Sequence, residues 1–169
     1  MNKDFAFTFG IITVSDKGSR GERKDESGPA AEELLKPMGG IMKKYMIVPD
    51  EREDIKKAIK EMADSLNIDM ILTSGGTGFS PRDVTPEATL EMIERIVPGI
   101  PEAMRAESLK ATPKAMLSRA MAGIRGRSLI INLPGSPKGV RECLSVVIPV
   151  LRHGIETLRG ETSECAERN

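Results

Sequence analysis

Four short apolar runs punctuate the chain, and three of them share one plan. In each of these three, the run is followed by a glycine-rich or acidic loop and then by apolar residues at helical spacing. The runs lie in FTFGIITVSD (7–16), KKYMIVPDE (43–51), DMILTSGG (69–76) and SLIINLPG (128–135). Apolar strands separated by helices predict a parallel sheet covered on both faces. The expected fold class is α/β, a three-layer sandwich with a mainly parallel central sheet.

Helix signals fill the gaps between the first three runs. Pro29 suits a first helical turn, and Gly39 and Gly40 should end that helix. After the second run, one apolar face of a helix is expected to carry Ile55, Ile59, Met62 and Leu66. The loop from Asp16 to Ser27 has balanced charges and is predicted to be solvated and flexible.

The second half of the chain has weaker signals. Thr85 is expected to cap a helix with Pro86 in its first turn, and a long helix from about Lys138 to Arg159 should kink at Pro149. PEAMRAESLKA (101–111) is predicted to be helical. The following stretch could continue as helix, but alternation at Ala120, Ala122 and Ile124, with Arg125-Gly126 at a turn, favours a small hairpin.

The size and charge of the chain limit the classes of function that it can have. The 169 residues suggest one domain at 1–160 with a polar C-terminal tail at 161–169. With 25 basic and 25 acidic side chains, no net field favours nucleic acid or a membrane, and four Phe, one Tyr and no Trp offer few surfaces for base stacking. No segment has the roughly 20 apolar residues of a membrane span. We expect a soluble, cytoplasmic protein that binds neither nucleic acid nor a membrane.

The sulfur-containing residues and the single histidine suggest packing and surface roles. His153 is the only histidine and is expected on a helix surface, which excludes a multi-histidine metal site. Cys143 should be a packed thiol and Cys165 an exposed one. The methionines between 104 and 121 are predicted to pack in the core or in subunit contacts.

Candidate chemistry gathers in the loops that follow the strands. In an open parallel sheet, ligands bind outside the carboxyl ends of the strands. The loop beginning at Ser15 and Asp16, PDE (49–51), SGGTGFSPRD (74–83) and PGSPKG (134–139) should therefore form one rim. If the second and third strands are close, Asp50 and Asp83 face one crevice. Two such carboxylates can hold a magnesium ion on phosphates.

The glycine-rich loop suits an anion. Gly75, Gly76 and Gly78 leave backbone N–H groups uncovered, while Ser74 and Thr77 add hydroxyls. The usual nucleotide motifs, G-x-x-x-x-G-K-[ST] and G-x-G-x-x-G, are absent.

Plainer interpretations remain open for each of these features. The glycines can form only a tight turn, and PGSPKG can be only a capped helix start, although Ser136 and Lys138 can equally meet an anion. Asp50 can cap its helix, and Asp83 can order its own loop.

Six motifs occur together and in order. They are TVSD (13–16), DESG (25–28), PDE (49–51), TSGGTGFSPRDVTPEA (73–88), LSR (117–119) and LPGSPK (133–138). This set resembles the molybdopterin adenylyltransferase family of MogA/MoaB type from about Phe7 to Gly160. The resemblance implies an α/β fold with a hairpin subregion and a homo-oligomer, usually a trimer. It also implies Mg2+ as cofactor, ATP as substrate, and transfer of AMP to the terminal phosphate of molybdopterin with release of pyrophosphate, in molybdenum or tungsten cofactor biosynthesis.

Matching positions carry the expected roles. The resemblance assigns Asp50 and Asp83 to catalysis and to the magnesium site. With the hydroxyl of Ser74, the expected nucleotide- and pterin-binding set is Ser15, Asp16, Ser74, Gly75, Gly76, Thr77, Gly78, Pro134, Gly135, Ser136 and Arg119. Arg119 can meet phosphate or form an inter-subunit salt bridge.

A second function class uses the same fold. A non-catalytic carrier would bind molybdopterin without adenylylating it, but the retained PD (49–50) and RD (82–83) pairs favour the enzyme. A related domain acting in nicotinamide nucleotide recycling fits less well. Because the chain has no room for a metal-insertion module, a separate partner protein is expected to insert the metal.

Overall fold

A computed structural model describes residues 5–161 of the chain. Its core is one six-stranded sheet in the order β2-β1-β3-β6-β5-β4. The strands are β1 (Phe7–Val14), β2 (Gly40–Val48), β3 (Met70–Ser74), β4 (Arg95–Ile96), β5 (Ala122–Arg125) and β6 (Ser128–Leu133). The first four in spatial order run parallel, while β5 and β4 are antiparallel to their neighbours. The predicted mainly parallel sheet is confirmed, and β2 and β3 lie on either side of β1.

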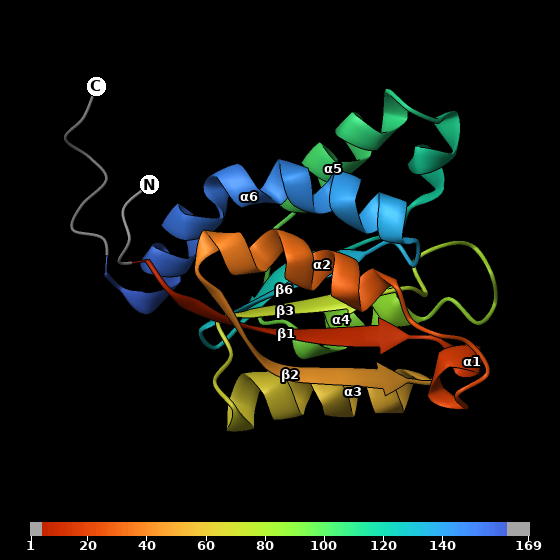
Figure 1. The fold of residues 1–169 in the computed structure, drawn as a ribbon, viewed down its shortest axis with the longest axis horizontal. Coiled ribbons are helices and arrows are strands. Elements are labelled where there is room, and N and C mark those ends of the chain that lie inside the picture. Colours follow the sequence, from red (N-terminus) through yellow and green to blue (C-terminus); the bar gives the residue numbers. More distant parts are fainter. Residues whose placement is uncertain (1–4, 162–169) are drawn as a thin grey trace.

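Helices cover both faces of this sheet (Figure 1). One apolar cluster packs α2 (Ser27–Leu35), α5 (Gly99–Leu109) and α6 (Pro137–Arg159) on one face. The other packs α3 (Arg52–Lys60) and α4 (Thr85–Met92) on the opposite face. The three-layer α/β sandwich expected from the sequence is therefore confirmed. Within residues 5–161, no helix has both the length and the apolar character needed to span a membrane.

Most predicted elements are present. The hairpin forms between β5 and β6 with Gly126 in the left-handed region at φ 54°, and α5 occupies the predicted helix after Pro98. Gly39, at φ 87°, ends the short helix Lys36–Met38 that extends α2. Pro149 lies inside a continuous α6, so a kink there stays a prediction.

Several local expectations were wrong. Leu66 is 44% exposed because α3 passes into a π-helix at Glu61–Ser65, whose wider turn rotates Leu66 off the buried face. Thr85 is the first residue of α4 and does not cap it; its hydroxyl donates to the carbonyl of Gly75 at 2.9 Å. The strand β4 gave no sequence signal, since only two residues pair.

The loop predicted to be solvated and flexible is exposed at residues 19–24 and hydrogen-bonded at its two ends, and its flexibility stays a prediction. It begins with a short helix, α1 (Asp16–Ser19), whose N-terminus the Ser15 hydroxyl caps by accepting from the N–H of Gly18. Farther along, the Asp25 carboxylate accepts hydrogen bonds from Thr13, Tyr45 and the start of α2. The loop is thus tied to β1, β2 and α2.

The remaining side-chain expectations divide by position. Cys143 is buried, and burial raises its pKa, as expected of a packed thiol; Cys165 and all but the first residue of the predicted tail at 161–169 lie outside the described residues. His153 is exposed on α6, as predicted. Met104 packs in the core, whereas Met116 is 64% exposed and does not pack in the core of this chain.

Candidate active site

The carboxyl ends of four parallel strands bring the predicted rim together. The N–H of Ser15 donates to Val48 at 2.9 Å, which joins the ends of β1 and β2. On the other side, the N–H of Gly75 donates to Leu133 at 3.1 Å, and the Ser74 hydroxyl donates to the carbonyl of Pro134 at 2.9 Å. Both contacts join the ends of β3 and β6. The rim expected from the sequence is confirmed.

The backbone of the glycine-rich loop is packed tightly against β1. Gly75 has φ +105°, and a Cβ atom there would lie 2.4 Å from the carbonyl oxygen of Val14. Gly76 has φ +65°, and a Cβ atom there would lie 2.3 Å from the hydroxyl of Thr85. Only glycine fits at either position, because the conformation and the space both exclude a side chain.

The carbonyl groups of this loop accept hydrogen bonds, whereas its backbone N–H groups at residues 76–78 are free in the described chain. The carbonyls of Gly75 and Gly76 accept from the hydroxyl and the N–H of Thr85. Those of Thr77 and Gly78 accept from the N–H and the Nε of Arg119 at 3.0 and 2.7 Å. Within the described chain, the N–H groups of residues 76–78 have no such partner. Consecutive free amides around a left-handed glycine form an anion-binding concavity.

Asp50 is fixed by a reciprocal pair of hydrogen bonds. Its Oδ2 accepts from the N–H of Asp16 at 2.7 Å, and its own N–H donates to Oδ1 of Asp16 at 3.0 Å. It does not cap α3, because the residue at that position is Glu51. Burial, followed by the charges of Asp16 and Asp83, raises the pKa of Asp50 against the lowering effect of the backbone hydrogen bond. Asp50 therefore lies within the electrostatic reach of Asp83.

Asp83 orders its own loop, as one interpretation of the sequence allowed. Its Oδ2 accepts from the N–H of Ser80 at 2.8 Å, and a Cβ atom on Gly78 would lie 2.9 Å from the same oxygen. The carboxylate is thus turned toward the glycine-rich segment.

Arg82 joins three of the four loops. Its guanidinium donates to both carboxylate oxygens of Asp16 at 2.9 to 3.2 Å and to Glu51 at 2.7 Å. The hydrogen bond from Arg82 holds the pKa of Asp16 below its usual range. Arg82 precedes Asp83, and Asp16 contacts Asp50. The contacts of Arg82 therefore help to fix the positions of the two predicted catalytic carboxylates relative to each other.

The donor set fits a magnesium ion only in company with a substrate. Hydrogen bonds among the described residues use Oδ2 of Asp50 and of Asp83 and leave Oδ1 of each for a ligand. No group of three or more His, Cys, Asp or Glu side chains within residues 5–161 is arranged to hold a metal. Magnesium is commonly bound by one or two carboxylates with substrate phosphates and water. Asp50 and Asp83 provide that number.

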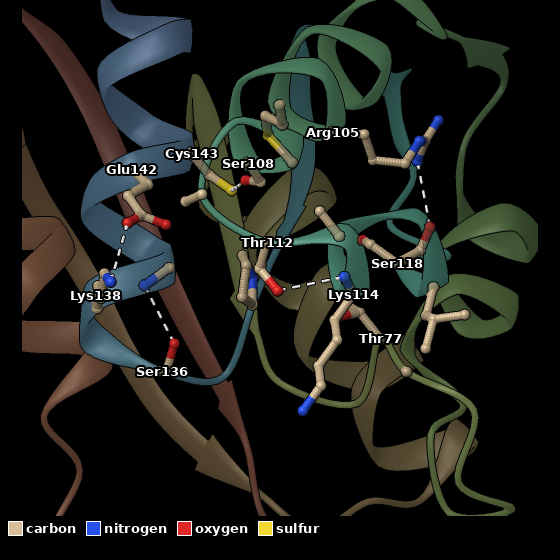
Figure 2. Close-up of a pocket in the computed structure, with 17 residues that line it drawn as sticks. Thr77, Arg105, Ser108, Thr112, Lys114, Ser118, Ser136, Lys138, Glu142 and Cys143 are labelled. Carbon is tan, nitrogen blue, oxygen red and sulfur yellow. Dashed lines mark hydrogen bonds and ion pairs between the residues drawn. The ribbon is translucent and has the colours of Figure 1, made fainter.

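Two cavities flank the segment from Pro134 to Pro137. The larger, of about 420 Å³, lies between the glycine-rich loop, α5 and the start of α6; its walls include Thr77, Gly78, Arg105, Ser118 and Lys138 (Figure 2). The smaller, of about 130 Å³, is lined by residues that include Ser15, Asp25, Ser74 and Gly135. Three of the four predicted loops therefore line a cavity, while PDE (49–51) lines neither of these two.

Ser136 contributes in a local way. Its hydroxyl accepts from the N–H of Gly139 at 3.1 Å and caps α6, while the residue also lines the larger cavity. The capped-helix interpretation is confirmed, and the cavity position keeps Ser136 among the binding candidates. Lys138 lines the same cavity, with its Nζ 3.8 Å from Glu142.

Arg119 makes contacts within this chain that test neither of its two predicted roles. Its guanidinium donates to the carbonyls of Gly78 and Asp83 and to the carboxylate of Glu87. The ion pair is therefore intrachain. The sequence offered no signal that identified these partners, since Glu87 and Gly78 lie 32 and 41 residues before Arg119.

Sequence reasoning gave no role to Asp25 or Arg82. Asp25 lies in the quoted DESG motif, and its five hydrogen bonds outweigh burial and keep its pKa low. Burial and the contact with Asp25 raise the pKa of Tyr45 to about 12. An acidic residue followed by Ser-Gly at a helix start was the available signal for this network.

Known proteins are similar to this chain in sequence and in fold. The family model for a probable molybdopterin binding domain matches residues 10–153. This chain belongs to that family. The family predicted from the six motifs is thereby confirmed.

Among members of the family, the molybdopterin adenylyltransferase of Helicobacter pylori strain J99 is 43% identical over 162 residues, which cover 95% of this chain and 92% of that protein. The molybdopterin adenylyltransferase of Escherichia coli K12 is 40% identical over 152 residues, covering 86% and 78%. The crystal structure of the molybdopterin biosynthesis enzyme MoaB from Thermus thermophilus is 52% identical, with a TM-score of 0.87 and coverage of 94% and 99%.

Proposed function

We propose that this chain is a molybdopterin adenylyltransferase, which transfers AMP from ATP to the terminal phosphate of molybdopterin and releases pyrophosphate. The observation that carries the proposal is the run of free backbone N–H groups at residues 76–78, here called the cradle. The neighbouring carbonyl groups all accept hydrogen bonds, so they do not compete for an anion. Asp83 lies against this cradle, and Asp50, linked to the same loop through Asp16 and Arg82, adds a second carboxylate for a cation. Family membership along most of the chain supports the same activity.

The reaction needs placement and charge more than acid–base chemistry. A phosphate oxygen of the pterin attacks the α-phosphorus of ATP, and the bond to the pyrophosphate oxygen breaks in line with it. The free amides of residues 76–78 are placed to bind phosphate oxygens. Asp50 and Asp83 would hold magnesium, which supplies positive charge to the phosphates when bound. Asp16 and Arg82 keep Asp50 in place.

The larger cavity suits the pterin. Its volume of about 420 Å³ lies in the usual range for small-molecule sites. Apolar walls from Met104 and Leu117 can contact a flat ring, and the side chains of Arg105, Lys114 and Lys138 bring positive charge toward an anionic ligand. Thr77 belongs to both this cavity and the cradle, so a pterin here would extend its phosphate toward the reacting centre.

A direct assay tests the proposal. The protein is mixed with Mg2+, ATP and molybdopterin, and pyrophosphate release is measured. We expect Asp83→Asn to lower turnover by roughly a hundredfold, about 3 kcal/mol of electrostatic stabilisation, with pterin binding kept; Asp50→Asn should be less severe. Normal turnover of both variants at saturating Mg2+ removes the assigned roles. Retention of pterin by the wild type without pyrophosphate release supports the carrier instead.

Assembly, location and metal delivery extend this proposal. We propose a homotrimer in the cytoplasm and a separate protein that inserts molybdenum or tungsten into the adenylylated pterin. Exposed apolar side chains at Ile96, Met116 and Leu117 support self-association, because removing apolar surface from water is favourable. Sedimentation of the purified chain tests the trimer.

A further inference from the structure

The geometry points to Arg119 as a positioning residue that couples the larger cavity to the loop bearing Asp83. This inference rests on the proposed function, because it assigns the cavity to the pterin. It differs from the two roles that the sequence suggested for Arg119, contact with phosphate and contact between subunits.

One residue holds both ends of the segment 77–83. The backbone N–H of Arg119 donates to Thr77 at 3.0 Å, and its Nε donates to Gly78 at 2.7 Å. A second guanidinium nitrogen donates to the carbonyl of Asp83. A planar fork with fixed donor directions can span two carbonyls in this way, whereas a lysine ammonium cannot hold the same geometry. The Arg119 side chain therefore bridges Gly78 and Asp83 directly.

The remaining contact of the Arg119 guanidinium is an ion pair that neutralises its positive charge. Arg119 pairs with Glu87, and the other oxygen of that carboxylate is buried with no partner in the described chain. The side chain of Arg119 is 32% exposed. Three of the five guanidinium donors of Arg119 are thus used within the chain, on two carbonyls and a carboxylate, an arrangement that holds structure.

The other side of Arg119 is the cavity wall. The preceding residue, Ser118, lines the larger cavity, and its carbonyl oxygen lies 3.5 Å from a guanidinium nitrogen of Arg105, a second lining residue (Figure 2). The same nitrogen donates to Ala120 at 3.3 Å. The two residues that flank Arg119 are thus tied to α5 across the cavity, and a ligand that contacts this wall acts directly on the backbone of Arg119.

These contacts form one continuous connection. It runs from Arg105 through residues 118–120 to the carbonyls of Gly78 and Asp83, and each link is a hydrogen bond or a covalent step. A pterin that fills the cavity fixes the wall, and the fixed wall holds the guanidinium on the segment 77–83. We expect pterin binding to order the Asp83 loop in this way before phosphate transfer.

The test uses Arg119→Lys with Arg125→Lys as a matched control. Arg125 also forms a bidentate ion pair, with Asp64, and donates to a backbone carbonyl, that of Met92, but it lies away from the glycine-rich loop. Hydrogen–deuterium exchange of residues 76–83 is measured with and without molybdopterin. In the wild type and in Arg125→Lys, the pterin should slow exchange there; in Arg119→Lys, the same segment should exchange faster and respond little.

Kinetics provide an independent measurement. Arg119→Lys should lower kcat by about tenfold or more, as expected for a small misplacement of a reacting group, while KM for ATP and pterin stays within about threefold. Glu87→Gln keeps both carbonyl contacts of Arg119 and should reduce kcat far less, so it serves as a second variant if Arg119→Lys is unstable. A guanidinium salt should restore part of the activity of Arg119→Ala.

The outcomes separate this inference from the proposed function. If Arg119→Lys matches Arg125→Lys in both exchange and kcat, the coupling is refuted. If Arg119→Lys instead exchanges faster throughout the chain, its role is general stability and the inference is also overturned. If the wild type releases no pyrophosphate but pterin slows exchange only when Arg119 is present, the coupling stands and adenylyl transfer fails.

Discussion

Gly78 offers a way to move one carboxylate by a known amount. Its φ lies outside the left-handed region, so alanine fits the backbone, yet the added Cβ would lie 2.9 Å from Oδ2 of Asp83. An ordinary contact between carbon and oxygen is about 3.4 Å, so the carboxylate must retreat by roughly 0.5 Å. Its hydrogen bond to Ser80 would change at the same time. The substitution therefore perturbs Asp83 without removing it.

The expected loss follows from this displacement. A shift of about 1 Å in a reacting group costs on the order of a hundredfold, so a shift of half that size should cost about tenfold in kcat, or roughly 1.4 kcal/mol. Pyrophosphate release at saturating Mg2+, ATP and pterin measures the change in Gly78→Ala. Gly99→Ala is the control, because its Cβ would meet no atom within 4 Å and its φ also permits alanine. It should keep wild-type turnover.

A double-mutant cycle identifies the cause. If Gly78→Ala acts through the carboxylate, it should add little to the loss already caused by Asp83→Asn, since the displaced group no longer carries its charge. Equal turnover of Gly78→Ala and Gly99→Ala at every magnesium concentration refutes the displacement argument. Additive losses on the two backgrounds show instead that Gly78 acts independently of Asp83.

Two further predictions concern stability. Asp69 pairs with Arg159 at 2.8 Å and accepts two hydrogen bonds from Thr8. Asp69→Asn should lower the free energy of unfolding by about 3 kcal/mol and Tm by about 6 to 12 °C at pH 7. Burial acts to raise the pKa of Asp69, but the contacts with Arg159 and Thr8 leave it below 3.8, so this stabilisation is complete above that pH and is lost as the pH falls through the folded-state pKa. Melts should therefore show the gap to the wild type closing in acid, and a constant gap contradicts the assignment. Gly154→Ala fills open space within α6 and should raise the free energy of unfolding by about 0.5 to 1 kcal/mol in urea titrations with activity unchanged; a loss of stability contradicts it.

The sequence predicted the sheet and the rim because both follow from local patterns. Apolar runs such as those ending at Val14 and Ser74 specify buried parallel strands, and chain direction then places their following loops at one edge. The placement of Asp50 and Asp83 in loops at that edge follows from the same rule. Sequence reasoning failed where one residue changes the helical phase, as at the π-helix that exposes Leu66.

The partners of charged side chains were harder to predict than the strands. Arg82 carried no signal of its own and Arg119 looked like a phosphate ligand or a subunit contact, but each bridges segments that are distant in sequence. An arginine has five donors and a long stem, so many partners satisfy it, and only the folded arrangement selects among them. The identity of a glycine is more informative, because Gly75 and Gly76 meet conditions that no other residue satisfies.

The two arginines divide the work of holding the Asp83 loop. Arg82 ties it outward to Asp16 and Glu51, at 51% exposure of its side chain, where salt and water weaken ion pairs. Arg119 ties it inward through backbone carbonyls and is less exposed. The exposures therefore indicate that salt weakens the Arg82 contacts more than the Arg119 contacts, so that at high ionic strength the Asp83 loop is held mainly by Arg119.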